Sequence, residues 1–194
     1  MSVLSTASLL TVTLVSGAVM LGDAAAVKLD CIVMRQNLDS RPSPLDSVSF
    51  EVQGNPVKLC YGRPSAKGRT MIGGEAAPYG KLWRTGANEP TMIHTSTALN
   101  LAGIEIEPGS YSFYTLPGES EWQIVLNRST SQWGHEGRYS DEIKAQEVGR
   151  GAAKSESIDA YVETFTMRTE AVGEDVMLLL EWEHTRVRVP ISGR

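Results

Sequence analysis

Short runs in which apolar and polar residues alternate restrict the fold of this chain more than any other feature. Val48, Phe50 and Val52 alternate with polar residues, and residues 57–61 (VKLCY) alternate in the same way. A period of two is typical of a β-strand that has one solvated face. Because the turn sequence at residues 54–56 (GNP) separates these two runs, we expect them to form a hairpin.

Further strand-like runs follow along the chain and are separated by turn residues such as Pro and Gly. The predicted segments are residues 91–101, 104–106, 110–116, 122–126, 161–169, 176–182 and 185–191. Together with the first hairpin they amount to about eight to ten short antiparallel strands. This pattern predicts an all-β fold, a single β-sandwich or barrel-like domain. Only residues 139–148 have a composition that suits a helix, and their low apolar content predicts that it lies on the surface.

The overall composition is that of a globular domain. Hydrophobic residues make up 41% of the 194 residues and charged residues make up 21%, so a core of useful size can be buried. The formal net charge is −5, and the chain contains no basic run. A mildly acidic chain of this kind has no electrostatic reason to bind nucleic acid, which we therefore exclude as a partner.

The first 26 residues differ from the rest of the chain in their lack of charge. No ionisable side chain precedes Asp23, and residues 3–21 are apolar with small hydroxyl residues among them. A helix of about 20 residues can cross a lipid bilayer, so an N-terminal helix over residues 3–21 is expected to be a membrane anchor if it is retained. The alternative is a signal peptide that is cleaved after residues 24–26 (AAA), a small-residue pattern.

Both interpretations place the folded domain outside the cytoplasm, on the periplasmic side. The expected organisation is an apolar N-terminal segment (1–26), a linker (27–46) and a β domain (47–194). In an oxidising compartment, Cys31 and Cys60 are able to form a disulfide. The alternative is two unrelated thiols, with Cys60 packed as a small apolar residue in its strand.

The connection between residues 61 and 89 contains most of the candidate binding residues. It combines several cations with glycines and a tryptophan, and long irregular connections of this kind are often functional. Arginine holds carboxylate or phosphate groups in a bidentate fork, and tryptophan offers a stacking face. A small anionic or carbohydrate ligand, or a protein partner, is therefore expected here. The candidate residues are Arg63, Lys81, Trp83, Arg84, Asn88, Glu89 and Trp133.

The same side chains also have a purely structural interpretation. Arg84, Asn88 and Glu89 are able to satisfy backbone groups of the loop and one another, which would hold the loop across the edge of the sheet. Among the tryptophans, Trp122 and Trp182 are in phase with apolar strand positions and are expected in the core. Trp133 is expected to be exposed, where it would suit a protein interface.

The wording of this loop and of several later segments resembles a known family. The segments are YGRPSAKGR, YGKLWRTGANE, PGSYSFYTLPG, EWQIVLN, QWG and WEHTRVRVPI, and the resemblance covers residues 43–191. They are similar to the bacterial family called domain of unknown function 2911. This resemblance implies an exported β-rich domain, and it supplies no activity and no catalytic residue. The positions that match the family are Tyr61, Gly62, Arg63, Pro64, Gly80, Trp83, Arg84, Gly86, Asn88, Glu89, Tyr111, Trp122, Trp133, Gly134, Arg186 and Pro190.

The sequence gives no catalytic residue, no cofactor and no metal site, which favours a non-enzymatic protein. His94, His135 and His184 lie far apart in the sequence, and no HExxH motif, paired-cysteine motif or phosphate-binding glycine loop is present. His94 is the best candidate for a general base, although a hydrogen-bonded histidine within a strand is the simpler interpretation. Both Cys60 and His94 depart from the pattern of the family.

These observations lead to three hypotheses for the function, in order of preference. The first is a non-enzymatic accessory or stabilising subunit on the extracytoplasmic side of a membrane protein complex, held by its N-terminal segment. Small residues in that segment, such as Gly17 and Ala18, suit close packing against the helices of membrane protein subunits. The second is a secreted binding domain for a small anionic or carbohydrate ligand. The third is a hydrolase with a dispersed site.

Overall fold

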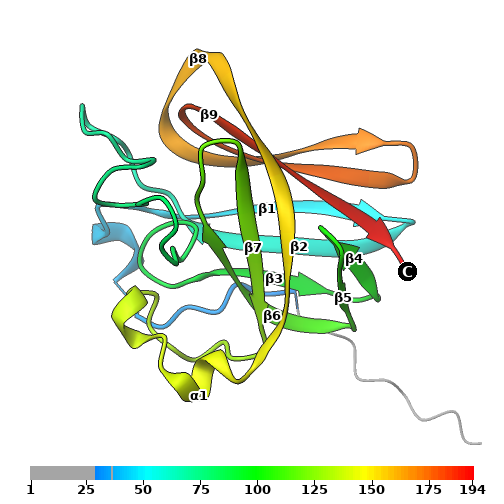
Figure 1. The fold of residues 1–194 in the computed structure, drawn as a ribbon. Helices are drawn as coiled ribbons and strands as arrows, with labels where there is room; N and C mark the ends of the chain where they lie inside the picture. Colours follow the sequence, from blue (N-terminus) through cyan, green and yellow to red (C-terminus); the bar gives the residue numbers. More distant parts are fainter. Residues whose placement is uncertain (1–28, 36) are drawn as a thin grey trace, which may run out of the picture.

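The computed structural model describes residues 29–35 and 37–194, which form one antiparallel sheet of nine strands (Figure 1). The strands are β1 (Leu45–Val52), β2 (Asn55–Gly62), β3 (Thr91–Thr95), β4 (Leu99–Leu101), β5 (Ile104–Ile106), β6 (Gly109–Leu116), β7 (Glu121–Asn127), β8 (Glu147–Val172) and β9 (Asp175–Gly193). The helical elements are η1 (Leu38–Ser40), η2 (Glu136–Arg138) and α1 (Asp141–Lys144). The all-β prediction and the expected number of strands are confirmed.

The sheet is not closed into a barrel, so the barrel-like alternative is wrong. The order of strands is β1-β2-β3-β6-β7-β8-β9-β4-β5, and the end strands β1 and β5 each pair with one neighbour in the described chain. The sheet instead curls, which brings β1 close to β8 and β9 and brings β5 close to β8. In the described part of the chain the helical elements have only three or four residues each, so there the sheet itself covers its apolar face.

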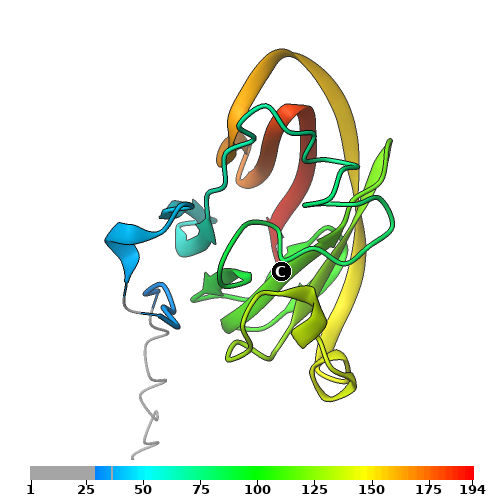
Figure 2. The ribbon, with the colours of Figure 1, turned by 90° about the vertical axis from the view of Figure 1, so that its left-hand side faces the viewer.

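The expectation of short strands is also wrong for the C-terminal part of the chain. Residues 161–169, 176–182 and 185–191 belong to two long strands, β8 with 26 residues and β9 with 19 residues. Register shifts between Ser157 and Thr166 interrupt the β8–β9 ladder without ending either strand. The extra residues let β8 bend, and Figures 1 and 2 show the bend as an arch at the top of the molecule.

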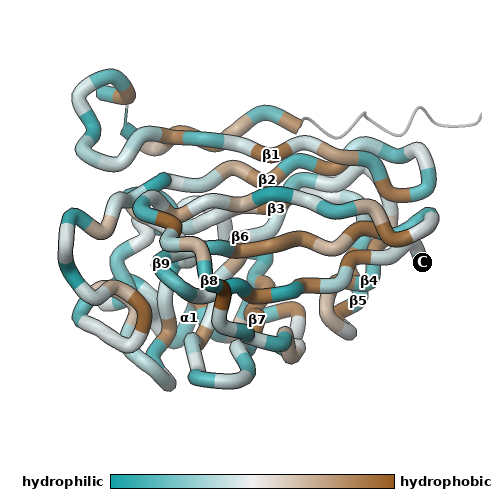
Figure 3. The backbone as a smooth tube through the Cα atoms, turned by 90° about the horizontal axis from the view of Figure 1, so that it is seen from above, coloured by the Kyte–Doolittle hydropathy of each residue, from teal (hydrophilic) through white to brown (hydrophobic). Residues whose placement is uncertain are grey.

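An aromatic cluster fills the centre of the curled sheet. Trp83 stacks on Trp182 with ring centroids 5.8 Å apart, and it meets Trp122 and Phe165 edge to face at 6.0 and 5.2 Å. The predicted core positions of Trp122 and Trp182 are confirmed, because their exposed fractions are 1% and 2%. Figure 3 shows apolar and polar residues interspersed along the strands of the sheet. Burial of such large side chains supplies much of the hydrophobic stabilisation.

The helix predicted over residues 139–148 is much shorter than expected. Only α1 forms there, and the Ser140 hydroxyl caps it by accepting a hydrogen bond from the Ile143 N–H. From Glu147 onward the chain pairs with β7 instead. Pairing with β7 is favoured because the segment has too few apolar residues for tertiary packing to stabilise a longer helix.

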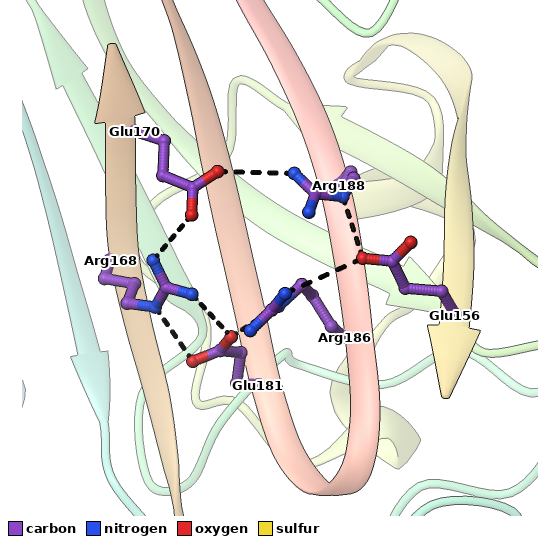
Figure 4. Close-up of polar contacts among 6 residues, drawn as sticks. All are labelled: Glu156, Arg168, Glu170, Glu181, Arg186 and Arg188. Atoms are coloured by element: carbon purple, nitrogen blue, oxygen red, sulfur yellow. Dashed lines mark hydrogen bonds and ion pairs between the residues drawn. The ribbon is translucent and has the colours of Figure 1, made fainter. Parts of the chain in front are cut away.

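A network of ion pairs fastens the bend of the β8–β9 hairpin (Figure 4). Its members are Glu156, Arg168, Glu170, Glu181, Arg186 and Arg188. The Glu181 carboxylate accepts hydrogen bonds from Arg168 at 2.9 and 3.0 Å and from Arg186 at 2.5 Å. Arg188 lies 2.8 Å from Glu156 and 3.3 Å from Glu170. These two glutamates come from opposite halves of β8, so the network ties the two halves together.

Residues 29–35 and 37–44, which we call the strap, belong to the predicted linker (27–46) and are fastened to the sheet. A disulfide joins Cys31 of the strap to Cys60 in β2, with the two Cα atoms 5.6 Å apart. The predicted anchor or signal segment (1–26) lies outside the described residues. Within the part of the chain that the structure describes, no helix is long and apolar enough to cross a membrane.

Candidate functional site

Glu89 is buried beneath the strap rather than exposed in its loop. Its carboxylate forms a bidentate ion pair with Arg41, with N–O distances of 2.7 and 2.8 Å, and it accepts a hydrogen bond from the Met34 N–H at 2.9 Å. Burial raises the pKa of Glu89, but the hydrogen bonds from Arg41 and from backbone N–H groups outweigh it and lower the pKa below 4.5. Glu89 therefore holds the strap in place.

Arg63 and Asn88 are also engaged by other parts of the chain. Arg63 donates to the Phe165 carbonyl at 3.2 Å and to the Thr166 hydroxyl at 2.9 Å, so it connects the end of β2 to β8. Asn88 donates to the Ser43 carbonyl at 2.9 Å, which is a further attachment of the strap. Both side chains satisfy groups within the chain, as the structural interpretation of this loop expects.

The remaining loop candidates lie in different environments. Trp83 is 2% exposed and offers no stacking face to a ligand. Lys81 is exposed to solvent. Trp133, which was expected to be exposed, is half-buried because the Arg35 guanidinium of the strap lies over its ring, 4.1 Å from the centroid.

Three glycines of the motifs allow the end of β2 and two loops to cross at close range. A Cβ at Gly62 would collide with the Ala87 carbonyl, and a Cβ at Gly86 would lie 2.7 Å from the Gly62 carbonyl oxygen. A Cβ at Gly134 would lie 2.6 Å from the side chain of Arg84. The loops around these glycines therefore pack directly on one another, and their packing fixes the position of Arg84.

Arg84 lies at the wall of a cleft beside this crossing. Its guanidinium is 3.2 Å from the Glu136 carboxylate, and its backbone N–H donates to the same carboxylate at 3.1 Å. The cleft consists of two adjoining hollows of about 310 and 380 Å³, and Arg69 and Glu75 line both of them. The ionisable side chains that line the cleft are those of Arg69, Glu75, Arg84, His135 and Glu136. This cleft is the candidate site of the protein.

Backbone contacts hold the cleft in shape. The Arg69 side chain donates to two carbonyl oxygens of its own loop at 3.0 and 3.1 Å. The Glu183 carboxylate, at the bend of β9, accepts hydrogen bonds from the N–H groups of Met71 and Ile72 at 3.0 and 2.8 Å. The cleft loop is therefore bound to the bend of the long hairpin.

Of the polar cleft residues, only Arg84 was among the candidates from the sequence. Arg69 and Glu75 belong to the connection between residues 61 and 89, but the sequence pattern there does not distinguish them from its other charged residues. His135 and Glu136 directly follow the QWG segment, and this position was their only sequence signal. The pairing of residues 84 and 136 is a tertiary contact, which no local pattern encodes.

A buried polar network lies behind the segment that carries His135 and Glu136. The Gln132 side chain donates to the Tyr114 hydroxyl at 3.1 Å and to the Ser112 hydroxyl at 3.2 Å. Burial raises the pKa of Tyr114 to about 12, so its hydroxyl stays protonated at neutral pH. The segment is thus held to β6 by uncharged hydrogen bonds.

His94 lies apart from the cleft and is 1% exposed. Its Nδ1 is 2.8 Å from the Ser110 hydroxyl oxygen, and its Nε2 has no hydrogen-bond partner in the described chain. Burial lowers the pKa of His94 below 6.5, and the nearby Lys58 cation lowers it further. A histidine enclosed in this way has no access to a substrate in solution. Among the described residues, no group of three or more His, Cys, Asp or Glu is arranged to hold a metal ion.

Comparison with known proteins agrees with the resemblance seen in the sequence. The chain matches the family model described as "Protein of unknown function (DUF2911)" over residues 43–191. No curated protein and no solved structure matched the chain. The matched range includes part of every strand and all polar residues of the cleft. The chain therefore belongs to the DUF2911 family.

Proposed function

We propose that this protein is a non-enzymatic accessory or stabilising subunit on the extracytoplasmic side of a membrane protein complex. The way in which the strap is fastened to the sheet carries this proposal. The Cys31–Cys60 disulfide and the buried ion pair between Arg41 and Glu89 hold the strap at two separate points. A cross-link and a buried ion pair leave a chain segment little conformational freedom.

A fixed strap suits a domain that is held at a membrane by the segment before it. Nine residues (22–30) separate the apolar stretch (3–21) from Cys31, so ten Cα–Cα steps lead from residue 21 to Cys31. An extended chain spans at most about 3.6 Å per residue, so a helix over residues 3–21 would keep Cys31 within roughly 35 Å of the bilayer. The domain would then reach only partners near the membrane surface.

Exposed tyrosines, rather than the candidates from the loop, are the side chains best placed to contact a partner. Arg63, Asn88 and Glu89 bond to other parts of the same chain. Tyr79 and Tyr161, in contrast, are 45% and 48% exposed. Tyrosine is enriched at protein interfaces, because it buries a large apolar ring and keeps a polar hydroxyl. These two side chains are therefore the first to test as contacts with membrane protein subunits.

Purification from native membranes in a mild detergent tests the proposal. We expect an intact mass that includes residues 1–26, together with other subunits in a fixed ratio. When a foreign cleavable signal replaces residues 1–26, the domain should appear in the soluble fraction without those subunits. A foreign transmembrane helix at the same place is the matched control for membrane attachment alone. Unchanged recovery of the partners after the deletion would contradict the proposal.

The cleft favours a second candidate function, the binding of a small polar ligand by an exported domain. The observation behind it is the convergence of two guanidinium groups and two carboxylates on one hollow of about 310 Å³. Arg84→Ala is expected to remove any ligand-induced rise of the unfolding temperature and to leave the fold intact. Lys81→Ala, a change at an exposed cation outside the cleft, is the control. Loss of folding in Arg84→Ala would show that Arg84 is structural.

A further inference from the structure

The charged groups of the cleft are balanced, but only half of them are paired. The guanidinium of Arg84 and the carboxylate of Glu136 neutralise each other at 3.2 Å. Arg69 and Glu75 line both hollows, and neither forms an ion pair with another described residue. The cleft therefore presents one unpaired cation and one unpaired anion to solvent.

The hydrogen-bonding groups of the cleft show the same division. Nε and Nη2 of Arg69 are used by carbonyl oxygens of its own loop, so its Nη1 group remains as a donor. Nδ1 of His135 accepts a hydrogen bond from the Gly137 N–H at 3.1 Å, which places the proton of the neutral ring on Nε2 and makes Nε2 a second donor. The Glu75 carboxylate is exposed and is an acceptor.

Two other ligand classes fit this arrangement less well. A simple anion would be attracted by Arg69 but repelled by the unpaired carboxylate of Glu75. A saccharide would lack a stacking face, because Trp83 and Trp182, the aromatic residues of the cleft, are each 2% exposed. A ligand that carries both a carboxylate and an ammonium group satisfies both unpaired charges at once.

We propose that the cleft binds a small zwitterion, a free amino acid or a dipeptide. The ligand carboxylate contacts Arg69 and Nε2–H of His135, and the ligand ammonium group contacts Glu75. Hollows of about 310 and 380 Å³ lie at the lower end of the range for small-molecule sites, which suits a ligand of this size. This inference rests on the second candidate function and assigns its ligand class.

Calorimetric titration of the full chain in mild detergent tests the inference. The probes are the free protein amino acids and glycylglycine. For any amino acid that binds, its N-acetyl derivative lacks the ammonium charge and its amide lacks the carboxylate. We expect each blocked derivative to bind at least about tenfold more weakly than the parent zwitterion. Glu75→Gln should weaken binding of the zwitterion by a similar factor. It should not weaken binding of the N-acetyl derivative, which is an anion that Glu75 repels, and Lys81→Gln should change neither.

The outcomes separate the ligand class from the existence of the site. Equal binding of the N-acetyl derivative or of inorganic phosphate would show an anion site and overturn the zwitterion assignment alone. Preferential binding of maltose, used as a saccharide probe, would overturn it in the same way. Absence of binding for every probe would overturn both this inference and the second candidate function. Glu75 is exposed, so Glu75→Gln is expected to fold and these comparisons remain interpretable.

Discussion

The side chains of Glu89, His94 and Glu181 are almost fully excluded from water, with exposed fractions of 4%, 1% and 6%. Arginines pair with both glutamates, whereas the His94 ring forms a hydrogen bond with the hydroxyl of Ser110. A buried charge that loses its partner is destabilising, because water cannot take the place of that partner. Substitutions at these positions are therefore expected to have larger effects than substitutions at exposed cations such as Lys81.

Glu89→Gln is expected to lower the free energy of unfolding by about 3 kcal/mol, because it leaves the buried Arg41 guanidinium without a counter-charge. Urea denaturation followed by tryptophan fluorescence measures this change. Lys81→Gln is the control and should change the free energy by less than about 0.5 kcal/mol. A cost for Glu89→Gln as small as that of the control would mean that the ion pair does not fasten the strap.

The stability of the protein is expected to depend on pH through His94. Its pKa in the folded state lies below the 6.5 of the unfolded chain, so the unfolded state binds the proton first as the pH falls. The contribution of His94 to the free energy of unfolding is therefore full above about pH 6.5, and it is lost as the pH falls from there through the pKa of the folded state. Asp30, Lys58 and Ser110 surround the ring, and the neutral form is the one that suits this site.

Denaturation of the wild type and of His94→Gln at about pH 7.5 and about pH 5.5 isolates this contribution. Carboxylates titrate in both proteins, so the difference between them belongs to His94. We expect a smaller loss of stability on acidification in the variant. Equal losses would show that the ring takes up a proton in the folded state without cost.

At the scale of elements, the bend of the β8–β9 hairpin connects the ion-pair network to the cleft. Glu183 lies at the bend with a positive φ of 52°, a conformation that a non-glycine residue rarely adopts. Its carboxylate binds the cleft loop through two backbone N–H groups. The conformation is therefore retained by contacts on both sides of the bend, the network on one side and the loop on the other.

The central position of Glu181 predicts unequal effects within the network. Burial raises the pKa of Glu181, but Arg168 and Arg186 outweigh it, so the side chain is charged at neutral pH. Glu181→Ala is expected to cost about 2 kcal/mol of unfolding free energy, because two arginines lose a nearly buried partner. Glu170→Ala, at a carboxylate that is 43% exposed and screened by solvent, should cost clearly less than Glu181→Ala. If chemical denaturation shows that both variants lose the same unfolding free energy, Glu181 has no central role in the network.

At the scale of the whole molecule, the strap and the curled sheet form one folded unit. The disulfide attaches the strap to β2, and Glu89 and Asn88 attach it to the loop before β3. The outer side of β3 is consequently closed, and even His94 is buried there. The strap therefore belongs to the domain and determines where the preceding chain leaves it.

Replacing Cys31 and Cys60 together by Ala tests this unity. Loss of a cross-link between residues 29 positions apart is expected to cost about 3 kcal/mol of unfolding free energy. Amide hydrogen exchange should accelerate in the strap and in β3, and much less in β8 and β9. Each single Cys→Ala variant under reducing conditions is the control for side-chain volume. Unchanged exchange in β3 would show that the strap covers it without help from the disulfide.

Local patterns were sufficient for the elements and for part of the core. The period of two located most strands, and the phase of Trp122 and Trp182 correctly placed both in the core. The sequence motifs identified the family, because family membership is recognised from the order of residues alone. These properties are encoded over a few neighbouring residues, where side-chain direction follows directly from strand geometry.

Only the tertiary structure decided how the sheet curls and where its polar groups meet. The bend of β8 depends on register shifts against β9. The burial of Glu89 depends on Arg41, which is 48 positions away, and the cleft depends on the contact of Arg84 with Glu136, which is 52 positions away. The sequence around a charged loop residue is the same whether a distant residue pairs with its charge or water solvates it. That difference arises only when packing brings the two segments together.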